Sequence, residues 1–262
     1  MMSTPLPSTG LDVTESKSDR SGNVRIGCAG WSLPTEHSDR FPAEGTHLAR
    51  YAARFPAVEI NSSFYRPHRP ATYTRWAASV PADFRFSVKV PKVATHERRL
   101  VDVDDVLDNF LAEATQLGDR LGPLLVQLPP SLSFSVDIAQ RFFAALRARF
   151  AGDVALEPRH ASWFEPAADR LVTQYHVARV AADPAVVPAA AEPGGWDGLV
   201  YYRLHGSPKV YHSAYPDEYL GALAKALTHA APSATVWCVF DNTAVGAATV
   251  NALDVLGRVR AD

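Results

Sequence analysis

Polar side chains follow short apolar runs at several points along this 262-residue sequence. Polar and apolar residues alternate in these runs, so the polar ones share one face of an extended chain. Carboxylates and histidine can move protons, amides can form hydrogen bonds, and lysine and arginine can bind an anion. The set comprises Glu59, Asn61, Lys89, Gln127, Glu157, Arg159, Arg203, His205, Asp241 and Asn242.

Three cations in this set favour an anionic ligand. Lys89 offers a point charge, whereas Arg159 and Arg203 offer planar forks that match a carboxylate or a phosphate. Asp241 and Asn242 stand before a predicted helix, whose free N–H groups also favour an anion. The expected partner is therefore a small anionic metabolite, phosphorylated or sugar-like.

Acid–base chemistry is expected from four residues of the sequence. Glu59 and Glu157 are the candidate acids or bases. His205 is a candidate partner because histidine titrates near neutral pH. His96, in the segment after the third apolar run, is the other candidate partner if that segment folds over the site. The predicted catalytic residues are thus Glu59, Glu157, His205 and His96.

Four aromatic residues stand beside the polar positions: Trp31, Tyr65, Trp163 and Tyr202. Small-molecule pockets combine aromatic walls with a few convergent polar groups. We therefore expect these four side chains to line the ligand site. Packing is the alternative for each one, and Trp163 is the clearest case because it stands beside a predicted helix start.

A divalent-metal site is a second interpretation of the same region. Glu157, Asp183, His205 and Asp241 stand near the ends of four successive predicted strands. Arginines close by would compete with a metal for the carboxylates. We therefore expect no metal and no other cofactor. The sequence also lacks the phosphate-binding, dinucleotide-binding, hydrolase and zinc-protease motifs GxxxxGK, GxGxxG, GxSxG and HExxH.

The elements that would position these residues alternate between strands and helices. From Val24 onward, β-branched and aromatic runs alternate with helical patterns, which is typical of a parallel sheet with helices on its faces. Eight strands at a spacing of about 30 residues predict a single α/β domain, a (β/α)8 barrel of the TIM type, over residues 23–262. They are expected to begin near Val24, Ala57, Phe84, Pro123, Asp153, Val177, Gly198 and Thr235.

Two segments depart from this regular pattern. Residues 1–22 are rich in Ser, Thr, Pro and Gly and are predicted to form a mobile tail. Pro184–Gly195 lacks an apolar stripe, so the sixth helix of the barrel is expected to be weak or irregular. In any such barrel the active site forms where the strands end, which is where the polar set stands.

Composition narrows the function classes. Lys and Arg total 26 against 28 for Asp and Glu, and the net charge of −2 makes nucleic acid an unlikely partner without excluding it. No apolar stretch reaches the roughly 20 residues needed to cross a bilayer, and the start of the chain does not resemble a signal peptide. We therefore expect no membrane association and a cytoplasmic location. Oligomeric state has no signature in the sequence.

Several blocks of the sequence carry a family resemblance when they are taken together. They are Gly27–Trp31, Val58–Tyr65, Phe86–Lys89 with Thr95–His96, Gln127–Pro130, Glu157–Trp163, Tyr202–Gly206 and Phe240–Thr243. In this order they resemble the YecE-like family, domain of unknown function 72. The resemblance runs from about Val24 to Leu256 and implies a TIM-type barrel. It implies no particular activity, so the chemistry must come from the residues.

Three functions are compatible with these residues. The first is an enzyme that acts by acid–base chemistry, as hydrolases, lyases and isomerases do, on a small anionic metabolite. The second is a non-catalytic protein that binds a phosphorylated ligand or the end of a nucleic acid. The third is a hydrolase or isomerase that depends on a divalent metal. The polar residues at the strand ends favour the first.

Overall fold

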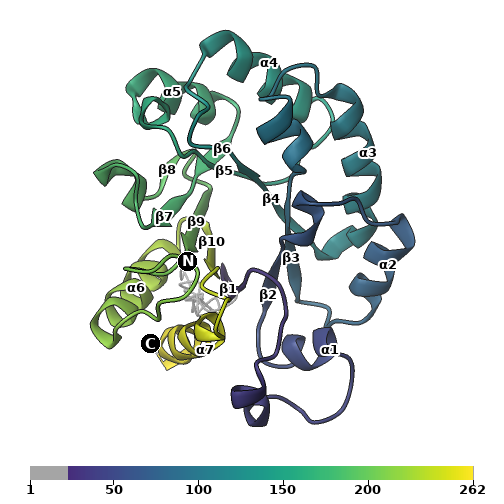
Figure 1. Cartoon of the computed structure of the whole chain (residues 1–262), viewed down its shortest axis with the longest axis vertical. Helices are drawn as coiled ribbons and strands as arrows, with labels where there is room; N and C mark the ends of the chain where they lie inside the picture. Colours follow the sequence, from purple (N-terminus) through teal and green to yellow (C-terminus); the bar gives the residue numbers. More distant parts are fainter. Residues whose placement is uncertain (1–22, 262) are drawn as a thin grey trace, which may run out of the picture.

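The protein has a mixed α/β fold with parallel strands. A computed structural model describes residues 23–261, so the tail predicted for residues 1–22 lies outside the described residues. The strands form two sheets, and Figure 1 shows the helices around the outside of them. The expectation of an α/β fold with parallel strands is therefore confirmed at this level.

The two sheets differ in size and in their edges. All strands of the four-stranded sheet are parallel, and it runs in the order β1 (Val24–Cys28), β10 (Thr235–Phe240), β9 (Leu199–Leu204), β7 (Ala181–Asp183). The six-stranded sheet runs β2 (Ala57–Ile60), β3 (Arg85–Lys89), β4 (Leu121–Gln127), β5 (Val154–Glu157), β6 (Val177–Arg179), β8 (Gly194–Gly195). Only β8 is antiparallel to its neighbour.

Each of the eight predicted strand regions contains a strand, and the sixth is divided. Val180 separates β6, which pairs with β5, from β7, which pairs with β9. One short segment therefore takes part in both sheets. The last strand pairs with the first, as a (β/α)8 barrel requires, with Val24 opposite Val236. At the other edge of β1, the Gly30 N–H donates to the carbonyl of Glu59 at 2.9 Å.

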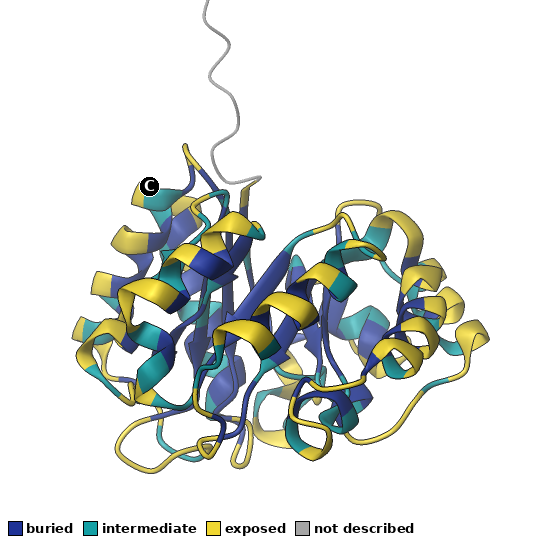
Figure 2. Cartoon of the chain, turned by 90° about the horizontal axis from the view of Figure 1, so that it is seen from above, coloured by how far each residue is buried: buried dark blue, intermediate teal, exposed yellow. Residues whose placement is uncertain are grey.

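Within residues 23–261, seven α-helices cover the strands and bury one face each, as the apolar periodicity predicts. In α3, for example, Leu107, Phe110, Leu111 and Ala114 are buried. Figure 2 shows exposed residues on the outward faces of the helices and buried residues along the strands. The helices are α1 (His47–Ala52), α2 (Pro70–Ala78), α3 (Asp104–Ala114), α4 (Val136–Arg147), α5 (Pro166–Gln174), α6 (Asp217–Ala230) and α7 (Ala247–Ala261).

Shorter helical segments lie in the connections. Among them are η2 (Thr35–Arg40), η3 (Ser62–Phe64), the π-helix η4 (Val93–Glu97), η5 (Thr115–Arg120) and η6 (Ala161–Phe164). In the sixth unit, η7 (Pro188–Ala191) stands where a regular barrel would have a full helix. This agrees with the irregular sixth helix that the sequence predicts. No helix within residues 23–261 is long and apolar enough to cross a membrane.

The strands separate two groups of buried apolar residues. The larger group lies between strands and helices, and the smaller group comes from the alternate strand positions. Small residues such as Ala57, Ala155 and Ala178 in this inner group leave room for the ring of Trp237. A Cβ atom on Gly122 would lie 2.6 Å from that ring, so glycine is required there. The inner group thus fills the space between the strands before their carboxyl ends.

Candidate functional site

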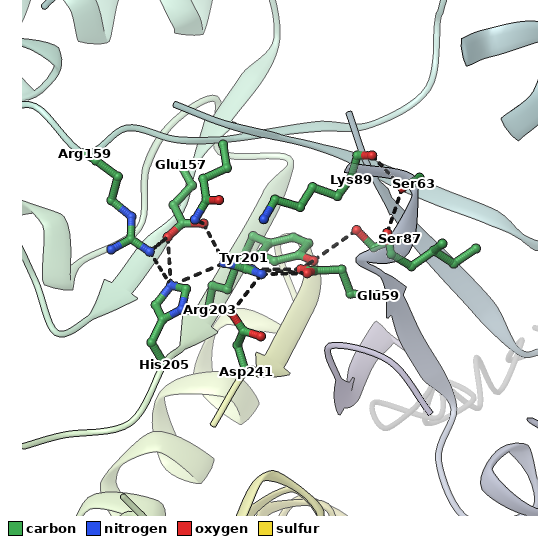
Figure 3. A network of polar contacts seen from close by, with 12 residues as sticks. Glu59, Ser63, Ser87, Lys89, Glu157, Arg159, Tyr201, Arg203, His205 and Asp241 are labelled. Atoms are coloured by element: carbon green, nitrogen blue, oxygen red, sulfur yellow. Dashed lines mark hydrogen bonds and ion pairs between the residues drawn. The ribbon is translucent and has the colours of Figure 1, made fainter. Parts of the chain in front are cut away.

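At the carboxyl ends of the strands, polar residues occupy the face that the inner apolar group occupies nearer the strand starts. They occupy the same alternate positions: Glu59 ends the face of β2 that begins with Ala57, and Glu157 follows Ala155 in β5. Four of them, Glu59, Glu157, Arg203 and His205, have no exposed surface. Figure 3 shows the resulting cluster, in which Glu59, Ser87, Lys89, Glu157, Arg159, Tyr201, Arg203, His205 and Asp241 are labelled. Gln127 belongs to the same cluster through its hydrogen bond to Glu157.

Arg203 lies at the centre of this cluster. Its Nε and Nη2 atoms donate to the two oxygens of Glu59 at 3.0 and 2.8 Å. Nη1 donates to Oε2 of Glu157 at 3.1 Å, and Nη2 lies 3.0 Å from Oδ2 of Asp241. Burial lowers the pKa of Arg203, but the three carboxylates outweigh it and hold the pKa well above its ordinary value. Arg203 is therefore permanently charged, and its guanidinium is occupied by three carboxylates of the protein.

Glu59 anchors Arg203 rather than standing free as an acid or base. Both of its oxygens accept hydrogen bonds from the guanidinium, and the Tyr201 hydroxyl lies 3.0 Å from Oε2. The same hydroxyl lies 3.0 Å from the hydroxyl of Ser87. Tyr201 is not among the predicted site residues, although the alternation that predicts Arg203 and His205 also places position 201 on their face.

His205 lies between two carboxylates. Its Nδ1 atom is 3.0 Å from Oδ2 of Asp241, and its Nε2 atom is 2.8 Å from Oε1 of Glu157. An imidazole in this position is fixed in orientation and has a carboxylate at each nitrogen, which is an arrangement suited to proton transfer. The structure thus brings together His205, Glu157 and Asp241, as the sequence predicts.

Glu157 is the most heavily contacted carboxylate of the cluster. Besides Arg203 and His205, it accepts from Nη2 of Arg159 at 2.5 Å and from Nε2 of Gln127 at 3.1 Å. Burial would raise its pKa, but Arg203, His205 and Arg159 together hold the pKa well below its usual range. Glu157 is therefore ionised at neutral pH and can hold a positively charged group, but it is not a general acid there.

Arg159 is a member of the cluster that is partly exposed to solvent. Its side chain is 20% exposed, and its Nη2 atom lies 2.7 Å from Nε2 of His205. Its Nε atom is buried and has no hydrogen-bond partner among residues 23–261. Arg159 thus retains donor capacity next to His205, which Arg203 does not.

Lys89 is the cluster's unpaired cation. It is 4% exposed, and its Nζ atom lies 4.1 Å from the centre of the Phe64 ring. Within the described part of the chain its ammonium makes no ion pair. Burial lowers the pKa of Lys89 to about 8, and the positive charge of Arg203 adds to this effect. The negative charges of Glu59, Glu157 and Asp241 act in the opposite direction but do not outweigh it. Figure 3 shows its side chain pointing toward Arg203 and Glu157.

His96 lies on the other side of the Phe64 ring. Its ring meets Phe64 edge to face at 5.0 Å, and its Nδ1 atom lies 2.9 Å from the hydroxyl of Thr95. Burial lowers the pKa of His96, and the nearby Lys89 and Lys92 lower it further. The segment after β3 therefore brings His96 near Lys89, but His96 is not hydrogen-bonded to the cluster.

Trp31 and Asn61 line a cavity of about 340 Å³ at the carboxyl ends of β1 and β2. The Trp31 ring meets Trp76 edge to face at 5.0 Å. The Oδ1 atom of Asn61 is buried and accepts no hydrogen bond from the described residues. This cavity combines an aromatic side chain with unsatisfied polar capacity, and Asn61 lies two positions beyond Glu59.

Three predicted aromatic walls lie elsewhere. Tyr202 falls between the inward-facing Tyr201 and Arg203, so the alternation of the strand turns it toward the helices, where it lines a separate hollow. Trp163 is buried in the outer core and donates from Nε1 to the carbonyl of Leu132 at 2.9 Å. Tyr65 is 66% exposed and lines a hollow against α3. The structure therefore does not bring these three aromatic residues together with the polar cluster.

Asn242 is buried, and its amide nitrogen forms hydrogen bonds within the segments around the site. Its Nδ2 atom donates to the carbonyl of Ser213 at 2.9 Å and to Oδ1 of Asn251 at 3.0 Å. Asn251 in turn accepts from the Tyr215 N–H at 3.1 Å. Asn242 therefore fixes the segment that follows β9 rather than pointing its amide nitrogen at a ligand.

The four residues of the metal interpretation do not form one ligand set. Asp183 accepts a hydrogen bond from the Tyr215 hydroxyl at 2.7 Å and lines the hollow beside Tyr202. Glu157 and Asp241 instead contact Arg203 and His205. No group of three or more His, Cys, Asp or Glu residues within 23–261 has the arrangement of a metal site.

Tyr211 belongs to the site and has no sequence signal. It is 47% exposed, its ring meets His205 edge to face at 5.8 Å, and its N–H donates to the carbonyl of His205 at 2.5 Å. Its φ of 67° places a non-glycine residue in the left-handed region, which costs energy. The loop after β9 therefore holds an aromatic ring over His205.

Comparisons with known proteins agree with the fold. A DUF72 family protein from Enterococcus faecalis V583 superposes with a TM-score of 0.75 at 21% identity, covering 90% of this chain and 95% of that chain. One from Thermotoga maritima MSB8 gives 0.72 at 24% identity, covering 88% and 97%. These similarities establish the shared fold.

Curated relatives are similar over part of their length. UPF0759 protein YecE of Escherichia coli K12 is 30% identical over 174 residues, covering 64% of this chain and 61% of that protein. UPF0759 protein YunF of Bacillus subtilis 168 is 31% identical over 156 residues, covering 55% and 53%. The aligned region thus spans less than two thirds of either relative.

The family model described as "Protein of unknown function DUF72" matches residues 25–262, nearly the whole chain. The resemblance that the sequence blocks carry is thereby confirmed. The protein belongs to the DUF72 family.

Proposed function

We propose that this protein is an enzyme that acts by acid–base chemistry on a small anionic metabolite, phosphorylated or sugar-like, at the carboxyl ends of its strands. The observation that carries the proposal is Lys89, a buried ammonium that lies on an aromatic ring and makes no ion pair within residues 23–261. Burying an unpaired charge costs stability. An anionic ligand would supply the missing counter-charge.

The residues around Lys89 divide into two roles in this proposal. Lys89 and Arg159 bind the anion, because both keep donor capacity that the protein does not use. His205 moves the proton, because the carboxylates of Glu157 and Asp241 hold both ring nitrogens. In this proposal Glu157 stays ionised and stabilises the protonated form of His205.

Further groups complete the proposed site. The cavity beside Trp31 and Asn61 provides space and an aromatic side chain for the neutral part of the metabolite. His96 is a second candidate for proton transfer, since it lies near Lys89 across the Phe64 ring. Tyr211 covers His205 from the solvent side. The ion pair between Glu59 and Arg203 keeps the other residues of the site in position.

We further propose that the two sheets are parts of one (β/α)8 barrel. The divided sixth strand, which pairs with β5 at its start and with β9 at its end, supports this proposal, as does the bridge between Ala29 and Glu59. The cluster would then occupy the mouth at which barrel enzymes have their active sites.

A binding protein without catalysis is the second candidate. One observation favours it: Arg203 and Glu59 are saturated by each other and by their neighbours, and Glu157 is held ionised, so much of the cluster is fixed. Such a protein would bind a phosphorylated ligand or the end of a nucleic acid through Lys89 and Arg159.

Ligand screening followed by turnover separates the two candidates. A thermal-shift screen against inorganic phosphate, sugar phosphates and short oligonucleotides would identify the ligand class, and NMR of the mixture would then follow conversion. The proposed enzyme requires that a stabilising sugar phosphate is converted, and that His205→Gln binds it but converts it at least a hundredfold more slowly. Binding without conversion by the unmodified protein would favour the binding protein. No stabilisation by any anion would contradict both.

A further inference from the structure

A second hollow, of about 270 Å³, lies on the helix side of the strands, between β7, β9 and α6. Figure 1 shows these three elements side by side. The hollow exists because the sixth unit has only the four-residue η7 where a full helix would cover β7. It is separate from the site at the strand ends, since Tyr202 lines it from the opposite face of β9.

The walls combine small residues with two aromatic rings. The small residues are alanines, and the space that they leave is bounded by Tyr202, Tyr219, Leu204 and Leu223. Tyr219 stacks on Tyr215 with ring centres 4.6 Å apart and an angle of 19° between the planes. One face of Tyr219 is therefore covered, and its position is fixed.

The charged side chains that line the hollow are negative. Asp183 and Glu192 are the charged residues in its lining, and no Lys, Arg or His of the described chain lines it. Tyr215 donates to Oδ2 of Asp183 at 2.7 Å, which fixes that carboxylate without neutralising it. Burial raises the pKa of Tyr219, and the negative charges of Asp183 and Glu192 add to the effect. The field in the hollow is therefore negative.

We propose that this hollow binds a small organic cation, an ammonium group with an apolar body. The ammonium would pair with Asp183 and Glu192, and the body would lie against the alanines and leucines. Tyr202 and Tyr219 would add cation–π attraction, the interaction by which aromatic pockets recognise ammonium ligands. The negative field repels the kind of anion proposed for the strand ends, so the two sites take ligands of opposite charge.

The test compares two ligands that differ mainly in charge. 2-Phenylethylamine is protonated at pH 7, and 2-phenylethanol is a neutral molecule of nearly the same shape. Isothermal titration calorimetry should show the amine binding at least roughly tenfold more tightly than the alcohol, as expected for a charge-assisted contact. Equal affinities, or an amine that does not bind at millimolar concentration, would overturn the proposal.

Three variants test whether the amine binds in this hollow. Glu192 is exposed, so Glu192→Gln should fold normally and weaken amine binding roughly tenfold. Asp119→Asn removes an exposed carboxylate outside the hollow and should leave binding unchanged. Ala226→Trp fills the hollow from the exposed face of α6 and should abolish binding while the melting temperature stays near that of the unmodified protein. Unchanged affinity in Glu192→Gln or in a folded Ala226→Trp would place the amine elsewhere and refute the site.

Discussion

Two buried cations at the strand ends have opposite relations to their surroundings. Arg203 contacts three carboxylates, whereas Lys89 contacts the ring of Phe64 and no carboxylate of the described chain. Removing Arg203 leaves charges without a partner, and removing Lys89 relieves an unpaired one. Substitutions at the two positions should therefore change the stability of the protein in opposite directions.

Arg203→Met should destabilise the protein by about 3 to 5 kcal/mol, because it leaves Glu59, Glu157 and Asp241 without their shared partner. Urea unfolding at pH 7 measures this change. Arg159→Met is the matched control, and its loss should be smaller because the side chain is partly exposed. A folded Arg203→Met protein as stable as the unmodified one would show that the network carries little stability.

Lys89→Met should stabilise the protein at neutral pH. The folded pKa is lowered to about 8 from 10.5, so between these values the unfolded chain holds the proton that the folded protein has lost. The stability of the unmodified protein therefore rises with pH across this window, and the full cost, about 3 kcal/mol, applies below pH 8. The gain from Lys89→Met should be largest at pH 7 and shrink toward zero by pH 10.5.

Urea unfolding of both proteins at pH 7 and pH 10 measures this difference. Lys92→Met, which removes a half-exposed lysine that pairs with Glu97, should show no comparable change between the two values. A Lys89→Met protein that is less stable than the unmodified one at pH 7 would mean that Lys89 has a stabilising partner.

At the scale of elements, the strands could be predicted because their alternation is regular. The same alternation placed Glu59, Glu157, Arg203 and His205 on one face, and the structure brings them together. Applied strictly, it would also have included Tyr201 and excluded Tyr202. Tyr202 stands next to the site residues in sequence, but it lies on the opposite face of the strand.

Other features could not be read from the sequence. The break of the sixth strand at Val180 and the antiparallel β8 depend on pairing between distant segments. Tyr211 reaches His205 through a loop with an uncommon backbone conformation, and loops have no periodicity. The ring of Phe64 under Lys89 is likewise a product of packing rather than of spacing.

The packing of β4 against β10 gives a test at this scale. Gly122→Ala places a methyl group 2.6 Å from the Trp237 ring, which has little freedom to move, and should cost about 1 to 3 kcal/mol. Gly257→Ala is the control: it meets no atom within 4 Å in α7 and should stabilise the protein by about 0.5 to 1 kcal/mol. Thermal unfolding measures both. If Gly122→Ala melts no earlier than the unmodified protein, the inner core is less tightly packed than described.

At the scale of the whole molecule, the polar cluster joins the two sheets. Glu59 and Glu157 belong to the six-stranded sheet, whereas Arg203 belongs to the four-stranded sheet and His205 follows it. The Arg203–Glu59, Arg203–Glu157 and His205–Glu157 pairs therefore cross from one sheet to the other. These ion pairs hold the two sheets together, so the stability of the molecule should depend on the ionisation of the groups that form them.

Acid should weaken this connection. The pKa of Glu157 is held well below its usual range, because nearby positive groups outweigh the effect of burial. A lowered carboxylate pKa contributes stability above the ordinary value of about 4.3, and that stability is lost as the pH falls through the lowered pKa. Glu157→Gln should therefore be much less stable than the unmodified protein at pH 7, and the difference should shrink below pH 4. A difference in urea unfolding that stays constant from pH 7 to pH 3 would contradict this account.

The central claim is that Lys89 binds an anionic ligand. Calorimetric titration with inorganic phosphate and sugar phosphates tests this claim most directly. The unmodified protein and Lys92→Met should bind the same anion with equal affinity, and Lys89→Met, although more stable, should bind it at least roughly tenfold more weakly. Folded Lys89→Met protein that binds the anion as tightly as the unmodified protein would contradict the claim.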